Sequence, residues 1–424
     1  MDTPPLPPAR DVAAAEGWVR EHLRAFVDDE VAGSPRFRGG QLAADAALAA
    51  LDVTGYAARR NEVWPAARRG ATAISPYVRH GLLSLPLLWG AVAAEPARDR
   101  DKFRDELLWQ EHGRHLYARV GSDNREGLRR TLVGTPVGTT AAREAEMVEG
   151  AAGDVWDRSM ACLDVTVDEL VTDGYLVNQA RMWLASHWAV REGRDWRDGE
   201  DVFYRHLLDG SRAANRAGWQ WTIGTGTGKA YGFSRWQVEK RAPGLCDTCV
   251  HRDACPIEDW PADPPLSATE EHPRLRRDED PAVTAGPTSP QVTGRAEQVW
   301  LTAESLGDDD PALAAHPGLP AVFVFDAPLL ARLRLSGKRL VFLVETLADL
   351  AERRELRVAV GDPVEELAGV PLATTFAPVP GFRRRAAALE IVARHPWPWL
   401  VAPHGGSVAS FSAWRKAARR TRTG

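Results

Sequence analysis

The chain has 424 residues, 44% of them hydrophobic and 26% charged, and a formal net charge of −5 at pH 7. These values are typical of a soluble globular protein, and the length predicts two domains. No apolar run approaches the roughly 20 residues needed to span a bilayer. The N-terminal MDTPPLPPAR also lacks a secretory signal pattern, so we expect a cytoplasmic protein. The acidic balance does not favour nucleic-acid binding, but it does not exclude a local basic face.

Residues 1–260 are expected to form a helical domain. From residue 10 onward, apolar residues recur at helical steps with Gly or Pro between the runs, as in RDVAAAEGWVREHLRAFVDDEV. Residues 261–296 are rich in proline and charge and poor in aromatic residues, which predicts a linker. Residues 297–424 alternate short β-branched runs such as PAVFVFDA with helical segments, which indicates an α/β domain with a parallel sheet.

Hydroxyl side chains precede a predicted helix in TAISPYVRHGLLSL, residues 72–85. Thr72 and Ser75 lie where the helix is expected to begin. The free N–H groups and the positive dipole end of a helix favour a phosphate group at that position. The same residues are also typical of a simple helix cap, so this segment alone leaves both interpretations open.

The segment KFRDELLWQEHGRHL, residues 102–116, places three functional candidates on one side of a helix. Glu106, Trp109 and Gln110 are related by steps of three and four, so they share a face. The alternative is that Trp109 belongs to the core and that its polar neighbours are solvated.

The segment GYLVNQARMWLASHW, residues 174–188, repeats this arrangement. Asn178, Arg181 and Met182 have the same spacing and therefore share one helix face. A single methionine on a helix usually packs in the core, whereas the asparagine and arginine beside it indicate a binding face.

The segment DGSRAANRAGWQW, residues 209–221, is the most unusual of the chain. A buried helix repeats apolar residues at three- and four-residue steps. This segment instead mixes small, polar and aromatic residues. Such a mixture is expected of a helix that lies closely against a planar ligand.

Taken in chain order, these four segments resemble the flavin-binding region of the photolyase/cryptochrome family, over about residues 45–235. The resemblance implies a noncovalently bound FAD, an ion pair between Arg181 and Asp209, and Asn215 beside N5 of the flavin. The residues that would hold the cofactor are Thr72, Ser75, Phe103, Gln110, Asn178, Arg181, Asp209 and Asn215.

The chain departs from the family at two positions that commonly carry arginine. Ala73 stands at the first position and Gln110 at the second. Arg68 and Arg69 are nearby candidates to replace the first arginine.

The resemblance also implies which residues act on damaged DNA and on the flavin. The catalytic candidates are Glu106, Trp109, Met182, Asn215 and Trp221. Trp219 matches the electron donor closest to the flavin, and Trp196 matches the second member of the electron-transfer chain. No tryptophan stands at the expected place of the third member.

The cysteines form a candidate metal centre. LCDTCVHRDACP contains Cys246, Cys249 and Cys255, and Cys162 lies far upstream. Four thiolates can hold an iron–sulfur cluster or a structural zinc ion, and the usual zinc arrangement pairs two C-x2-C elements, of which this chain has one. The pattern resembles the iron–sulfur subgroup of bacterial cryptochromes and photolyases, which implies a [4Fe–4S] cluster; zinc and free thiols are the alternatives.

Residues 297–424 resemble the Rossmann-like domain of the same family. Ordinary members have this domain first and the helical domain second, so the order here resembles a circular permutation. The family's basic stretch after the first strand is replaced by TAESLGDDD, which leaves an antenna chromophore undecided.

The sequence therefore predicts a light-driven photolyase that splits pyrimidine dimers in UV-damaged DNA by electron transfer from reduced FAD. The first alternative is a cryptochrome-like photoreceptor without repair activity, which Gln110 and the acidic net charge favour. The second is a degenerate FAD-binding scaffold, against which Arg181, Asp209 and Asn215 argue.

Overall fold

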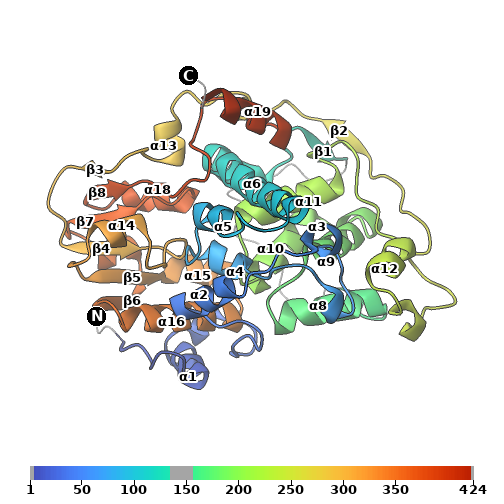
Figure 1. Cartoon of the computed structure of the whole chain (residues 1–424), viewed down its shortest axis with the longest axis horizontal. Helices are drawn as coiled ribbons and strands as arrows, with labels where there is room; N and C mark the ends of the chain where they lie inside the picture. Colours follow the sequence, from blue (N-terminus) through green and yellow to red (C-terminus); the bar gives the residue numbers. More distant parts are fainter. Residues whose placement is uncertain (1–3, 134–155, 422–424) are drawn as a thin grey trace.

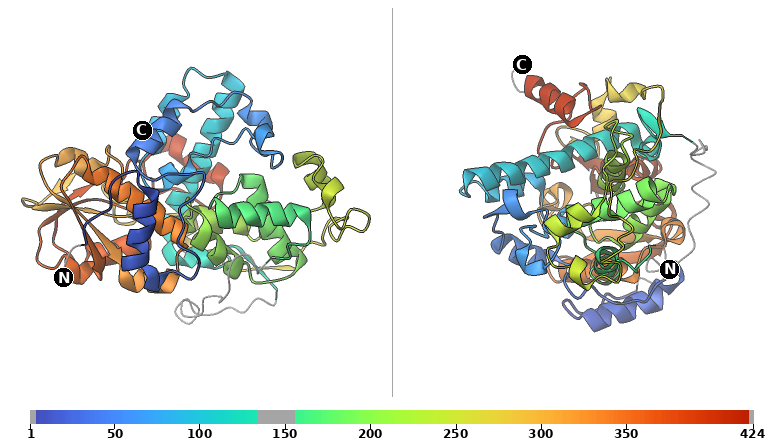
Figure 2. Two further views of the ribbon diagram at one scale, coloured as in Figure 1. Left: turned by 90° about the horizontal axis from the view of Figure 1, so that it is seen from below. Right: turned by 90° about the vertical axis from the view of Figure 1, so that its right-hand side faces the viewer.

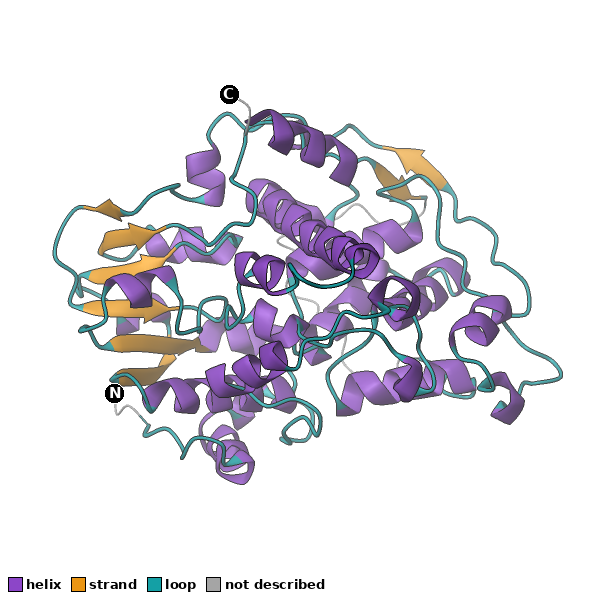
Figure 3. Ribbon diagram, in the orientation of Figure 1, coloured by secondary structure: helices purple, strands orange, loops and turns teal. Residues whose placement is uncertain are grey.

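A helical assembly and a six-stranded sheet lie side by side in the computed structural model, which describes residues 4–133 and 156–421 (Figures 1 and 3). The helices precede the sheet in the chain. No helix within the described ranges is long and apolar enough to cross a membrane.

Most of the described chain up to residue 260 is helical. Its α-helices are α1 (Val12–His22), α2 (Gln41–Ala49), α3 (Tyr56–Arg59), α4 (Ser75–Arg79), α5 (Leu85–Ala91), α6 (Ala97–Val120), α8 (Ala161–Thr172), α9 (Asn178–Ser186), α10 (Trp196–His206), α11 (Arg212–Ile223) and α12 (Arg235–Arg241). The long helix α6 packs against α3, α5 and α11. Helix α6 thus connects the early helices α3 and α5 with the later helix α11.

The sheet has the strand order β3-β8-β7-β4-β5-β6. Its strands are β3 (Gln291–Val292), β4 (Gln298–Leu301), β5 (Ala321–Asp326), β6 (Leu356–Gly361), β7 (Leu372–Thr375) and β8 (Ile391–His395). Strands β4 to β8 pair in parallel, and β3 joins the edge antiparallel to β8. The order β6-β5-β4-β7-β8 is that of a doubly wound sheet, so the predicted α/β parallel-sheet domain is confirmed.

Helices connect the strands and cover the sheet (Figure 2). They are α14 (Pro311–Ala315), α15 (Ala327–Leu333), α16 (Gly337–Ala351), α17 (Pro363–Glu366) and α18 (Pro380–Ala386), and α19 (Phe411–Thr421) follows the last strand. The central strand β5 is AVFVFD, and its first five residues are buried. An almost continuous apolar run is expected of a parallel strand that is covered on both faces.

Helix α16 joins the sheet to the helical assembly, because it packs against β6 and also against α1, α2 and α10. Every residue from 337 to 350 is buried, including charged ones. The Glu345 carboxylate accepts a hydrogen bond from the Gly39 backbone N–H at 3.0 Å, and Asp349 accepts one from Gln41 N–H at 2.8 Å. Buried carboxylates are therefore paired across the joint, as buried charges must be.

Residues 261–296, predicted as a linker, contain regular elements. β2 (Leu266–Ala268) pairs antiparallel with β1 (Arg130–Leu132), and the segment continues through η7 (Pro273–Leu275) and α13 (Pro281–Ala285) to β3. η7 and α13 both pack on α6. The proline-rich, charged composition of this segment indicated a flexible linker. Composition could not show that β2 would find a partner strand, β1, far away in the sequence.

Candidate functional site

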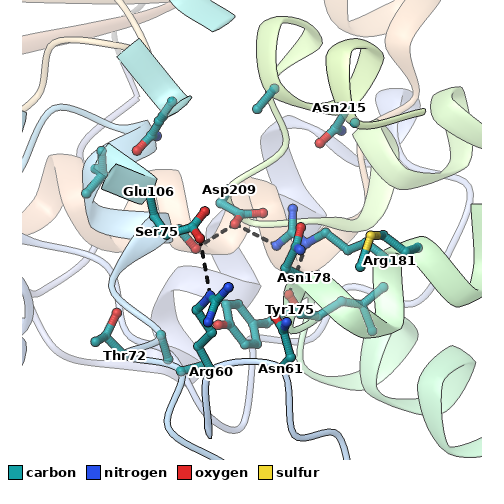
Figure 4. A pocket seen from close by; sticks show the side chains of 18 of the residues that line it. Arg60, Asn61, Thr72, Ser75, Glu106, Tyr175, Asn178, Arg181, Asp209 and Asn215 are labelled. Carbon is teal, nitrogen blue, oxygen red and sulfur yellow. Dashed lines mark hydrogen bonds and ion pairs between the residues drawn. The ribbon is translucent and has the colours of Figure 1, made fainter. Parts of the chain in front are cut away.

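A cavity of about 290 Å³ lies between α3, α4 and α6 on one side and α9 and α11 on the other (Figure 4). The predicted residues that line it are Thr72, Ser75, Phe103, Glu106, Gln110, Asn178, Arg181, Met182, Asp209, Asn215 and Trp219. Segments separated by more than 100 residues in the chain are thereby brought together around one hollow.

Helical spacing explains which side chains face this cavity. Phe103, Glu106 and Gln110 follow one another at steps of three and four along α6. On α9, Arg181 and Met182 lie three and four residues after Asn178. Residues at these steps lie on one face of a helix. Each helix therefore presents one polar face to the cavity and packs with the other.

Asp209 is the polar centre of the site. Arg181 Nη2 donates to Asp209 Oδ2 at 2.7 Å, and Ser75 Oγ donates to the same oxygen at 2.6 Å. The predicted ion pair between Arg181 and Asp209 is present. Burial alone would lower the pKa of Arg181, but the adjacent Asp209 carboxylate outweighs it and raises that pKa, so the guanidinium stays charged.

Three buried polar atoms of the cavity residues have no hydrogen-bond partner among the described residues. They are Asp209 Oδ1, Asn215 Nδ2 and Trp219 Nε1. Such a group costs about 1–3 kcal/mol when it is left unpaired. A polar heterocycle in the cavity could pair with them, so the site fits a flavin by the chemistry of its free donors and acceptor.

A second part of the cavity wall contains Arg60, whose charge is paired with the Glu106 carboxylate. Glu106 Oε1 lies 3.2 Å from Arg60 Nε and 2.8 Å from Lys102 Nζ. Arg60, Asn61 and Thr72 lie along the same side of the cavity in Figure 4. These cationic and polar groups are suited to an anionic group such as a phosphate.

Arg68 and Arg69, the candidates to replace the arginine missing at Ala73, do not line the cavity. Arg68 pairs with Glu62 at 3.4 Å, and Arg69 pairs with Glu169. The cavity residues not predicted from the sequence include Tyr56, Arg60, Asn61, Tyr175 and Phe203. For Arg60 and Asn61, the only signal in the sequence was their position shortly before Thr72. That position alone does not show that their side chains face the cavity.

Trp109 and Trp221 lie beside the cavity and do not line it. Each is 43% exposed. The Trp109 ring stacks on Phe411 of α19, with ring centroids 4.0 Å apart and planes tilted by 9°. Because adjacent residues on a helix point about 100° apart, Gln110 and Thr222 face the cavity while their tryptophan neighbours lie outside it.

Aromatic rings lead away from the cavity at Trp219. Its ring centroid lies 5.2 Å from that of Phe203, which is 6.0 Å from Trp156, which is 5.1 Å from Trp188. Trp196, predicted as the next member after Trp219, is buried. Its ring lies 5.1 Å from the Arg197 guanidinium, and no ring contact to Trp219 is found in the described part of the chain.

The four cysteines line a second, small cavity of about 20 Å³. All four thiols are free, and the Ala161 backbone N–H donates to Cys249 Sγ at 3.5 Å. Burial, together with the neighbouring thiols, raises the pKa of Cys162, and burial raises that of Cys246 to about 11. Within the described ranges, no three His, Cys, Asp or Glu side chains already have the arrangement of a metal-ion site.

Comparison with known proteins identifies the helical region. Residues 103–242 match the family described as the FAD binding domain of DNA photolyase. The chain is 27% identical over 171 residues to a deoxyribodipyrimidine photo-lyase from a Synechococcus species, covering 38% of this chain and 34% of that protein. It is 29% identical over 230 residues to a deoxyribodipyrimidine photo-lyase from Thermus thermophilus, covering 54% of this chain and 51% of that protein.

A crystal structure of a Synechocystis cryptochrome is also similar, at 21% identity and a TM-score of 0.40, covering 51% of this chain and 46% of that one. The chain thus spans between a third and about half of the length of the curated relatives that it matches. These matches show that residues 103–242 are similar to the FAD binding domain of DNA photolyase, and the matched relatives are photolyases.

Proposed function

We propose that the protein is an FAD-dependent photolyase that splits pyrimidine dimers in UV-damaged DNA. The observation that supports this most is the cavity in which Arg181 and Ser75 both donate to Asp209, beside the unpaired amide of Asn215. When bound in its reduced form, FAD supplies the electron that light transfers to a dimer.

Residues of both cavity walls would hold the cofactor. Arg181 and Asp209 would provide a fixed pair of charges for the ring system, and Asn215 Nδ2 would provide a free hydrogen-bond donor. Arg60 and Thr72 line the part of the cavity suited to the phosphates. In this proposal the protein supplies position and electrostatics, and the flavin supplies the redox chemistry.

The flipped dimer would enter from the side where Trp109 and Trp221 are exposed. Enzymes that act on a base must extrude it from the duplex, and a damaged pair is easier to open. Phe411 stacks on the Trp109 ring, and the 43% exposure of Trp109 would allow a base to stack on it as well. Glu106 and Met182 also line the cavity, and in this proposal they would contact the lesion.

Trp219 lines the cavity and would be the electron donor closest to the flavin. From there, electrons would arrive either through Trp196 or past Phe203 from Trp156 and Trp188. The ring contacts favour the second path. Flavin photoreduction in the presence of an external thiol reductant distinguishes them: Trp156→Phe should slow it on the second path, and Trp196→Phe on the first.

Light-dependent repair tests the main proposal. Chemically reduced protein should convert a dimer-containing oligonucleotide to the intact sequence in blue light and should not do so in the dark. Trp109→Ala should weaken binding of the damaged oligonucleotide by roughly 1–3 kcal/mol, the value of one stacking contact, and should keep its flavin. A wild-type protein that neither repairs dimers nor prefers them over undamaged DNA would exclude this function.

One observation favours the second candidate function, a photoreceptor without repair. Glu106 is held by both Arg60 and Lys102, so its carboxylate is engaged before any lesion arrives. A photoreceptor should show normal flavin photoreduction that depends on Trp219, together with no repair. The same two measurements therefore decide between the candidates.

We also propose that Cys162, Cys246, Cys249 and Cys255 hold a [4Fe–4S] cluster, with zinc as the alternative. Their lining of one cavity supports a shared ligand, and such clusters are held by four thiolates. Anaerobically purified protein should contain about four irons per chain. Zinc without iron in elemental analysis would decide for the alternative, and Cys249→Ser should lose the metal in either case.

A further inference from the structure

We propose that an aromatic track beside the cavity binds the DNA strand that flanks the flipped base. The track consists of Trp221, Tyr231, Trp260 and Trp236, in this order away from the cavity. The inference rests on the proposed function, because it names how the same site would hold the rest of its substrate.

The rings of the track follow one another closely. The centroids of Trp221 and Tyr231 are 6.1 Å apart, and those of Trp260 and Trp236 are 6.5 Å apart. Gly232 links the two pairs, since a Cβ atom at this glycine would collide with the Trp260 ring. The Trp260 ring therefore lies directly on the backbone at Gly232, which follows Tyr231, and this contact brings the two ring pairs next to each other.

The tryptophans of the track are exposed. Trp236 is 55% exposed and Trp260 is 57% exposed, whereas Trp183, Trp188 and Trp219 are almost completely buried. Neighbouring exposed aromatic rings indicate a surface that binds a partner. Their exposure also means that replacing them should leave the core intact.

Positive groups accompany the track. Lys240 Nζ lies 4.5 Å from the centre of the Trp236 ring, and Lys229 is exposed in the loop that joins α11 to Tyr231. Two carboxylates near the track, Glu239 and Glu258, are both bonded to Arg235, at 2.8 and 3.0 Å, while Asp259, directly before Trp260, is exposed. The track is therefore not dominated by negative charge that would repel a phosphate backbone.

The position of the track favours a nucleic-acid strand as its partner. Exposed aromatic rings combined with cations are the features that bind unpaired strands, because every base can stack on a ring while lysines attract the phosphates. Helix α11 carries both Trp219, inside the cavity, and Trp221, outside it. A strand with one base in the cavity would thus pass Trp221 and continue toward α12, at the end of the molecule opposite the sheet (Figure 1).

Binding of single strands of two lengths tests the proposal. Fluorescence anisotropy would compare dimer-containing oligonucleotides of about four and about 16 nucleotides, the range that one such surface covers. In the double variant Trp236→Ala/Trp260→Ala, each lost ring should raise the Kd for the longer strand by a factor of roughly five or more. The double variant should bind the shorter strand like the wild type and keep its FAD. Leu42→Ala, at a 48% exposed site on α2, is the matched control and should change neither affinity.

The outcomes separate this inference from the proposed function. If the wild type prefers dimers and the double variant binds the longer strand unchanged, the track is excluded and the repair function stands. If long strands bind without dimer preference and the double variant loses that binding, the track stands and repair is excluded. If the wild-type protein forms a homodimer, and the double variant is monomeric with unchanged DNA binding, the track is a protein–protein interface. That outcome overturns the inference.

Discussion

At the scale of residues, the chemistry of the cavity depends on a few groups held in fixed charge states. Arg181 is largely buried and is balanced by Asp209. A buried ion pair is weak evidence for stability in itself, but removal of one partner leaves an uncompensated charge. Ser75, which donates to the same carboxylate, adds a neutral hydrogen bond that cannot replace the arginine.

Arg181→Ala should therefore lower the free energy of unfolding by on the order of 3–5 kcal/mol and reduce FAD content, because Asp209 would remain buried without its partner. Urea unfolding and the flavin-to-protein absorbance ratio measure the two effects. Arg158→Ala is the matched control, since Arg158 pairs with Asp164 at 2.6 Å on the surface, where such a pair contributes at most about 1 kcal/mol. Full flavin occupancy and unchanged stability in the Arg181 variant would contradict the assignment.

Glu111 provides a pH-dependent prediction. Burial raises the pKa of Glu111 from 4.5 to about 7. A hydrogen bond from the Val401 N–H at 2.9 Å and the charge of the nearby Arg114 lower this pKa, but they offset only part of the effect of burial. A carboxyl group with a raised pKa stabilises the fold below pH 4.5 and loses this contribution as the pH rises toward 7, about 3 kcal/mol in total.

Histidines act in the opposite direction: burial lowers the pKa of His112 to about 4 and of His115 to about 3. Their contribution is present above pH 6.5 and is lost as the pH falls toward those values. Glu111→Gln should therefore remove the loss on the alkaline side and keep the loss on the acidic side. Urea unfolding at pH 5 and pH 8 measures both, and an unchanged difference between wild type and variant across this range would show that Glu111 does not titrate as proposed.

At the scale of elements, close packing of helices sets where the cavity residues point. Helix α10 approaches α11 at Gly199, where a Cβ atom would collide with the Trp219 ring. The ring is thereby held between α10 and the cavity. On the other side, Phe411 of α19 fixes the Trp109 ring on α6.

Gly199→Ala should destabilise the protein by about 1–3 kcal/mol, the usual cost of overpacking, and should slow flavin photoreduction because Trp219 must move. The matched control is Gly17→Ala on α1, where a Cβ atom would meet nothing within 4 Å. That change should stabilise the helix by roughly 0.5–1 kcal/mol. Chemical unfolding of both variants checks the contrast, which would be refuted if the two changed stability alike.

At the scale of the whole molecule, the α/β domain supports the flavin site without lining its cavity. Arg339 of α16 donates to the backbone carbonyl of Gly210 at 3.2 Å and to that of Tyr204. Arg79 of α4 donates to the same Gly210 carbonyl at 2.8 Å. The residue after Asp209 is therefore held from both domains.

Arg339→Ala should weaken FAD binding by about 1–3 kcal/mol, the cost of leaving a buried acceptor without its partner, although the residue lies outside the cavity. Titration of apoprotein with FAD measures the change. Arg354→Ala is the control: it removes hydrogen bonds to the carbonyls of Leu313, His316 and Leu319 within the α/β domain. It should lower stability and leave FAD affinity unchanged; equal FAD affinities for both variants would argue against support across the domain joint.

The permuted domain order also belongs to this scale and stays a proposal. The chain places its helices before its parallel sheet, and α16 buries charged residues between the two. Such a joint is compatible with either order of the domains, because it depends on which surfaces meet and not on where the connection runs.

Local features of this protein follow from its amino-acid sequence alone. Residue periodicity sets the faces of α6 and α9, and β-branched runs mark the parallel strands. The sequence also indicated the Arg181–Asp209 pair, through the family resemblance and not through spacing. These features depend on residues near one another in the chain or on one matched motif, so they can be identified without knowing how the elements pack.

How those faces meet follows from the packing of the folded chain. The fold places Arg60 at the cavity, turns Trp109 and Trp221 outside it, connects Trp219 to Phe203 rather than to Trp196, and pairs β1 with β2. One position along a helix changes direction by about 100°, so a motif cannot show which of two adjacent residues faces a ligand. Contacts between distant segments depend on the packing of whole helices, which no local pattern in the sequence specifies.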